Sequence, residues 1–178
     1  PQPVSAMPGL SGPSGTRASA PGLCEGLADR GFLGVAVPEE VGVAGAGHLE
    51  LFVVAEEMGR ALAPVPFSST VYLAAEAILL AGSDAQKQKW LPLIASGAAI
   101  GTLALFEGKG NPSPEGIKLS AAGGSLNGVK KPVPDGAIAD FIIVASRTGT
   151  SGRDGDLSLF LVDVKAGRVD AKAPPNID

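Results

Sequence analysis

The hydrophobic pattern of this 178-residue chain changes period near residue 100. Before that point, apolar residues recur at the spacing of one face of a helix. After it come short runs of Val, Ile and Leu, separated by Gly, Asn-Gly, Asp-Gly and Pro. The first pattern favours amphipathic helices and the second favours strands joined by turns. We therefore predict an α+β fold, in which an N-terminal helical bundle is followed by an antiparallel β-barrel or sandwich domain.

This pattern divides the chain into three segments. Residues 1–20 are rich in Pro, Gly and Ser, a composition typical of a flexible segment. Residues 21–99 are expected to form the helical domain, and residues 100–178 an incomplete β domain. The chain starts without Met and stops in a Pro-rich stretch, so we expect it to be a fragment of a longer protein.

Two amphipathic helices and a capped third one are predicted before residue 100. The first spans residues 49–63 and ends before Pro64, and the second spans residues 69–81 and ends before Gly82. Ser83 and Gln86 form a capping box that starts the third. The buried faces are expected to hold Leu51, Val54, Ala55, Met58 and Leu62 in the first helix, and Leu73, Ala77 and Leu80 in the second.

Short strands are predicted after residue 100, with a two-residue hairpin turn at Gly123-Gly124. The expected strands are residues 101–106, 117–121, 125–129, 141–145, 157–162 and, more weakly, 168–171.

Composition excludes several classes of function. The net charge is −4, and residues 1–100 carry 5 Lys and Arg against 9 Asp and Glu, so no basic stripe for nucleic acid exists. The apolar runs are shorter than the ~20 residues that cross a bilayer, and no signal peptide is visible, so a cytoplasmic location is expected. One Cys and one His exclude an internal disulfide and the usual metal sites.

Several residue patterns are candidate sites. The Gly42, Gly45 and Gly47 loop imitates a dinucleotide fingerprint with the wrong spacing, which favours an ordinary loop. The side chains of adjacent Glu56 and Glu57 point about 100° apart on a helix, so they cannot act on one substrate as an acid–base pair. Solvated or ion-paired carboxylates are therefore expected. His48 is expected to be a helix cap or surface residue, Cys24 a core or surface thiol, and Trp90 a core residue, in preference to catalytic or cofactor roles. The Lys130-Lys131 pair is expected to lie on a solvated strand edge in preference to binding an anionic ligand. The residues alone thus define a soluble helical domain plus a β domain, without a self-contained active site.

Short stretches spread over residues 22–178 nevertheless follow a recognisable order. They are Gly34 to Glu40, Glu50-Leu51, Glu56 to Arg60, Ala81 to Ser83, Gln86-Lys87, Trp90 to Pro92, Ala95 to Gly97, Ala104 to Glu107, Leu126 to Gly128, Lys130, Ala139-Asp140 and Leu159 to Val162. In this order the chain resembles the acyl-CoA dehydrogenase family. The resemblance implies an N-terminal helical domain and most of a middle β domain, with the C-terminal helical domain of the family absent.

The resemblance also implies an activity. Family members bind FAD and desaturate an acyl-CoA thioester: a carboxylate base removes the α-proton and a hydride passes to the flavin. The base usually lies in the third domain, so no catalytic residue is expected in this chain, and the fragment alone is expected to be inactive. The implied partners are an acyl-CoA substrate, an electron-transfer flavoprotein or similar acceptor, and further subunits of a homo- or hetero-oligomer. Divergent members act in lipid or steroid side-chain catabolism.

By the same resemblance, two segments would contact FAD. They comprise the cofactor-binding candidates Leu103, Leu105, Phe106, Glu107, Pro132, Val133 and Pro134. The chain departs from the family pattern here: Phe106 replaces a hydroxyl residue, Pro132 replaces an aromatic ring, and Pro134 lacks both a hydroxyl and an N–H donor. A family-like subunit with a degraded or shared FAD site is therefore the alternative hypothesis, and an unrelated binding module is the third.

Overall fold

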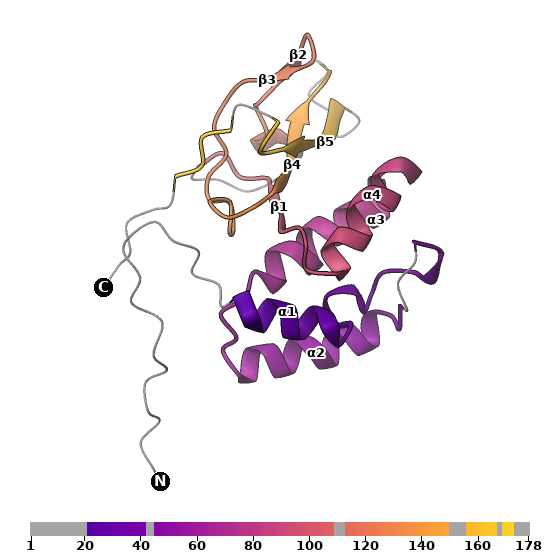
Figure 1. The fold of residues 1–178 in the computed structure, drawn as a ribbon. Helices are drawn as coiled ribbons and strands as arrows, with labels where there is room; N and C mark the ends of the chain where they lie inside the picture. Colours follow the sequence, from indigo (N-terminus) through magenta and orange to yellow (C-terminus); the bar gives the residue numbers. More distant parts are fainter. Residues whose placement is uncertain (1–20, 42–44, 109–112, 150–155, 167–168, 173–178) are drawn as a thin grey trace, which may run out of the picture.

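The computed structural model describes residues 21–41, 45–108, 113–149, 156–166 and 169–172. The helices gather in one part of the molecule and the strands in another, and β1 leads from the first into the second (Figure 1). The predicted α+β class is confirmed. Within the described ranges, no helix is both long enough and apolar enough to cross a membrane.

The helical part contains four α-helices and a π-helical segment within the described residues. Two short 3-10 helices, η1 and η2, connect the first two α-helices. The capping box of α4 is confirmed, because Ser83 Oγ accepts from the Gln86 N–H and Gln86 Oε1 accepts from the Ser83 N–H. The bounds are α1 (Pro21–Asp29), η1 (Phe32–Gly34), η2 (Glu39–Val41), α2 (His48–Arg60), η3 (Ser68–Ala75, the π-helix), α3 (Glu76–Ala81) and α4 (Asp84–Ala95).

Two expectations about the helical faces are wrong. The helix predicted over residues 49–63 ends at Arg60, and Leu62 lies beyond it with φ 46° and an exposed side chain. Leu80 is also exposed, at 79%, whereas Ala74, Ala75 and Ile78 are buried. A π-helix takes up more residues per turn than an α-helix, so η3 rotates the buried face away from the one that α-helical spacing predicts.

The main sheet is mixed. Its strands are β1 (Gly101–Ala104), β4 (Phe141–Arg147) and β5 (Leu157–Asp163), in the order β1-β4-β5. β4 runs antiparallel to β5 but parallel to β1, so the expectation of a purely antiparallel domain is wrong at that pair. The long connection between β1 and β4 permits the parallel arrangement, which a tight turn cannot form. The described strands form no closed barrel.

A small hairpin and a 3-10 turn complete the strand part. β2 (Ala121–Ala122) and β3 (Ser125–Leu126) pair across Gly123-Gly124, and both glycines have positive φ, as a two-residue hairpin requires. The hairpin is therefore confirmed, although its strands are shorter than predicted. The 3-10 turn is η4 (Pro114–Gly116). Of the weak strand predicted at 168–171, Arg168 lies outside the described residues and the other three residues form no strand.

One hydrophobic core joins the two parts. Phe141 of β4 is completely buried, and its ring lies 4.4 Å, centroid to centroid, from the ring of Trp90 in α4. The expectation that Trp90 belongs to the core is thus confirmed. Gly101 of β1 passes so close that an added Cβ would lie 2.3 Å from Phe141 Cζ and 2.7 Å from Ala74 Cβ. β1 can therefore pack on η3 only because residue 101 has no side chain.

Replacing Gly101 with Ala should destabilise the protein by about 1–3 kcal/mol, the usual cost of forcing an extra methyl group into a packed core. Gly59→Ala is the matched control, since Gly59 lies on exposed α2 with open space around it, and this change should stabilise by about 0.5–1 kcal/mol. Urea unfolding monitored by Trp90 fluorescence measures both. Equal effects of the two substitutions would contradict the close approach.

Candidate functional site

The residues just after β1 lie beside the Pro132–Pro134 segment. Thr102 Oγ1 donates to the Pro134 carbonyl at 2.6 Å. The Lys131 N–H donates to the Phe106 carbonyl, and the Gly108 N–H donates to the Lys131 carbonyl, both at 2.8 Å. The structure therefore brings together the two segments that contain all seven cofactor-binding candidates.

These candidates differ in exposure. Pro132 and Pro134 are exposed, and Phe106 is half-buried, as are Leu103 and Leu105. Val133 points the other way and packs on the apolar cluster formed by Ala104, Ala139 and Ile142. The two segments thus form a partly exposed apolar surface, and Val133 attaches it to the core by packing on this cluster.

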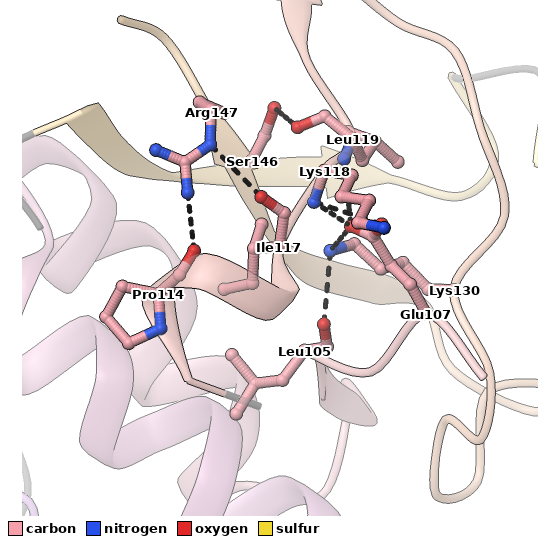
Figure 2. Close-up of polar contacts among 9 residues, drawn as sticks. All are labelled: Leu105, Glu107, Pro114, Ile117, Lys118, Leu119, Lys130, Ser146 and Arg147. Atoms are coloured by element: carbon pink, nitrogen blue, oxygen red, sulfur yellow. Dashed lines mark hydrogen bonds and ion pairs between the residues drawn. The ribbon is translucent and has the colours of Figure 1, made fainter. Parts of the chain in front are cut away.

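Glu107 has a structural partner, Lys130. Their side chains are only 17% and 6% exposed, and Lys130 Nζ lies 2.7 Å from Glu107 Oε1 (Figure 2). Lys130 Nζ also donates to the Leu105 carbonyl at 3.1 Å, while the Glu107 carboxylate accepts from the backbone N–H groups of Lys118 and Leu119. This ion pair ties the end of β1 to the start of the Pro132–Pro134 segment.

The surroundings of Glu107 keep it ionised. Burial alone raises the pKa of the Glu107 carboxyl, but the Lys130 ammonium and the two backbone N–H donors outweigh burial and hold the pKa below its ordinary value. A carboxylate with these partners has little remaining capacity to accept a proton, so its role in the site is structural.

Arg147 of β4 forms hydrogen bonds with the residues that precede Lys118 and Leu119. Its Nε donates to the Ile117 carbonyl at 3.1 Å and its Nη2 donates to the Pro114 carbonyl. The neighbouring Ser146, fully buried, donates to the Leu119 carbonyl at 3.0 Å (Figure 2). These bonds fasten residues 114–119 to β4, which places the N–H groups of Lys118 and Leu119 against Glu107.

The other predicted candidates are placed as follows. Glu56 and Glu57 are both ion-paired with Arg60, which confirms the expectation of ion-paired carboxylates. His48 is exposed, as expected of a surface residue, and its Nε2 lies 3.2 Å from Glu76 Oε1. Cys24 is half-buried, and Gly42 lies outside the described residues.

The interpretation of the Lys130-Lys131 pair as a solvated strand edge is wrong for Lys130. This side chain is buried against Glu107, whereas Lys131 is exposed. The sequence carries no local signal for the pairing, because the two partners are distant in the chain and short-range periodicity cannot connect them.

Comparison with known proteins places this architecture in a family. Residues 16–98 match the family model "Acyl-CoA dehydrogenase, N-terminal domain". The mitochondrial isovaleryl-CoA dehydrogenase of Pongo abelii is 35% identical over 128 residues, which are 68% of this chain and 30% of that protein. The chain belongs to the acyl-CoA dehydrogenase family. It spans about a third of the length of the curated relatives that it matches.

Solved structures extend the similarity into the strand part. The Tcur3481-Tcur3483 steroid ACAD is 36% identical, with a TM-score of 0.69 over 82% of this chain and 39% of its own. The ChsE4-ChsE5 complex from Mycobacterium tuberculosis is 33% identical, with a TM-score of 0.68 over 82% and 38%. A glutaryl-CoA dehydrogenase from Mycobacterium smegmatis in complex with FADH2 is 28% identical, with a TM-score of 0.68 over the same shares.

Lys130→Met should destabilise the protein by about 3–5 kcal/mol, because it leaves the Glu107 carboxylate buried without its cation. The double variant Lys130→Met with Glu107→Gln should recover most of this loss, since it removes the unpaired charge. Lys131→Met, at the exposed neighbour, should change stability by less than about 0.5 kcal/mol. Chemical unfolding compares the three, and a Lys130→Met variant as stable as Lys131→Met would contradict the buried pair.

The depressed pKa of Glu107 predicts a pH dependence of stability. A carboxylate with a lower pKa in the folded state contributes stability above its unfolded pKa, about 4.3, and this contribution is lost as pH falls through the folded value. The difference in unfolding free energy between the wild type and Glu107→Gln should therefore shrink on acidification below about pH 4.3. A difference that stays constant across that range would show that Glu107 is not stabilised as an anion.

Proposed function

We propose that this chain supplies the N-terminal helical domain and the FAD-contacting part of the β domain of an acyl-CoA dehydrogenase. In this proposal, residues 21–99 form the helical domain and residues 100–178 belong to the β domain. The observation that carries the proposal is the pairing of residues 102–108 with residues 131–134 in a member of this family. The reaction proposed is α,β-desaturation of an acyl-CoA thioester.

The residues at the paired segments fit a flavin ring. Exposed Pro132 and Pro134 and half-buried Phe106 offer apolar contacts to a flat aromatic surface. FAD is proposed to lie against these three residues with Leu103, Leu105, Val133 and the backbone of Glu107 beneath them. When bound, FAD supplies the acceptor for the hydride.

The residues of this chain have a binding role in the proposal. The Glu107–Lys130 ion pair holds the two segments in register, and the apolar surface excludes water from one face of the ring. The carboxylates next to these segments are engaged, Glu107 with Lys130 and Asp135 with Ser69. We therefore assign the base that removes the α-proton to a part of the full-length protein outside these residues.

Substrate and partners are proposed by analogy with similar proteins. The chain resembles a steroid ACAD and an isovaleryl-CoA dehydrogenase, which points to a branched or steroid-linked acyl-CoA in lipid catabolism. It also resembles the two-component ChsE4-ChsE5 complex and an electron-transferring flavoprotein of Acidaminococcus fermentans. We propose an oligomer with a second subunit, identical or related, and an electron-transfer flavoprotein or similar carrier as the oxidant of the reduced flavin.

The proposal is tested by adding FAD to the purified full-length protein and recording the flavin absorption band and Kd. Pro134→Glu should raise the Kd at least about tenfold, since it forces an unpaired charge against the ring. Leu159→Glu, at an exposed apolar residue of β5, should leave the Kd unchanged, because β4 separates β5 from β1.

Reduction of the bound flavin by acyl-CoA thioesters of different shapes then identifies the substrate. A full-length protein that takes up no FAD, or equal losses in the two variants, would overturn the proposal.

A further inference from the structure

Buried hydroxyl groups gather where the helical part meets β1. Ser69 and Thr70 of η3 are buried, as is Thr102 of β1. Thr70 Oγ1 donates to the Gly101 carbonyl at 3.2 Å, and Thr102 Oγ1 donates to the Pro134 carbonyl at 2.6 Å. Each hydroxyl therefore joins two segments that are distant in the sequence.

Ser69 makes the strongest of these contacts. Its Oγ lies 2.6 Å from Asp135 Oδ2, with the Pro66 carbonyl as a second, longer acceptor at 3.1 Å. A hydroxyl donating to a carboxylate at this distance forms a charge-assisted bond, which is about twice as strong as a neutral one. Ser69 is completely buried whereas Asp135 is exposed, so this bond ties a surface carboxylate to the core.

Asp135 has an unusual backbone conformation. It directly follows Pro134 and has φ 51°, a left-handed conformation that costs a non-glycine residue energy and persists only when the surroundings enforce it. The turn around it is closed by the Gly136 N–H, which donates to the Val133 carbonyl, and by the Ile138 N–H, which donates to the Asp135 carbonyl. The Ser69 hydroxyl thus holds one side chain of a strained turn that continues the Pro132–Pro134 segment.

We propose that Ser69 is a positioning residue for the cofactor segment. Its hydroxyl binds the Asp135 carboxylate and so fixes the orientation in which Pro132 and Pro134 face the flavin. The inference deepens the proposed function and rests on it. The inference also gives η3 a role, because this π-helical segment places the Ser69 hydroxyl within hydrogen-bond distance of Asp135.

The test combines Ser69→Ala, Asp135→Ala and the double variant in the full-length protein. Each single change should raise the Kd for FAD about tenfold, equivalent to about 1.4 kcal/mol. The double variant should be no weaker than either single variant, because both remove the same interaction. Ser69→Thr, which keeps a hydroxyl, should restore most of the affinity.

Backbone hydrogen exchange without FAD provides a second readout. Exchange at the Gly136 and Ile138 amides should accelerate in Ser69→Ala. Ser83→Ala is the matched control, since it also removes a serine hydroxyl bond in the helical part but lies at the cap of α4. It should leave both the Kd and these two amides unchanged.

The outcomes separate the two proposals. Unchanged FAD affinity in Ser69→Ala, or additive losses in the double variant, overturns the positioning role while leaving the proposed function intact. If the wild type binds no FAD, the proposed function fails and hydrogen exchange becomes the deciding measurement. Faster exchange at Gly136 and Ile138 in Ser69→Ala would then show that Ser69 stabilises the turn, and unchanged exchange would show that it does not.

Discussion

The close contact between β1 and η3 at Gly101 sets the position of β1 and of the candidate cofactor segments beyond it. With no Cβ at this residue, the strand backbone lies against Ala74 and the Phe141 ring, which in turn packs on Trp90. One buried core therefore spans the helices and the sheet, and the end of β1 emerges at a defined place beside them. The candidate cofactor segment inherits its position from this packing.

Hydrogen bonds and ion pairs fix the positions of segments that the hydrophobic core alone does not hold. Aromatic residues make up only 4% of the chain, so few large side chains lock its elements together. Buried hydrogen bonds and ion pairs are directional and costly to leave unmade, which suits them to fixing register. The Glu107–Lys130 pair joins the two candidate segments at one end and the Thr102–Pro134 bond joins them at the other, while the Ser69–Asp135 bond ties the second segment to η3. In the proposed function, these bonds hold half-buried Phe106 and exposed Pro132 and Pro134, the three residues at which the chain departs from the family pattern.

Much of the local structure could be predicted from short-range chemistry. The Ser83–Gln86 capping box and the Gly123-Gly124 hairpin depend on residues within a few positions of each other, and both are confirmed. Predictions failed where distant contacts decide the outcome. Leu62 is exposed because α2 ends at Arg60, and Leu80 is exposed because the π-helix that packs on β1 rotates the apolar face. The parallel pairing of β1 with β4 likewise depends on strands that are far apart in the chain.

The sequence by itself determined the order of helices and strands, their main turns and caps, and the resemblance to a family, because each depends on residue types at short spacing. Only the tertiary structure decided which polar groups distant in the chain are paired. Residue type and short-range spacing do not predict which of Lys130 and Lys131 is buried, yet Lys130 lies buried against Glu107 and Lys131 is exposed. Ser69 and Asp135 are separated by 66 positions. Such pairs form because desolvated charges and hydroxyls require partners, and which partner is within reach depends on how the core packs.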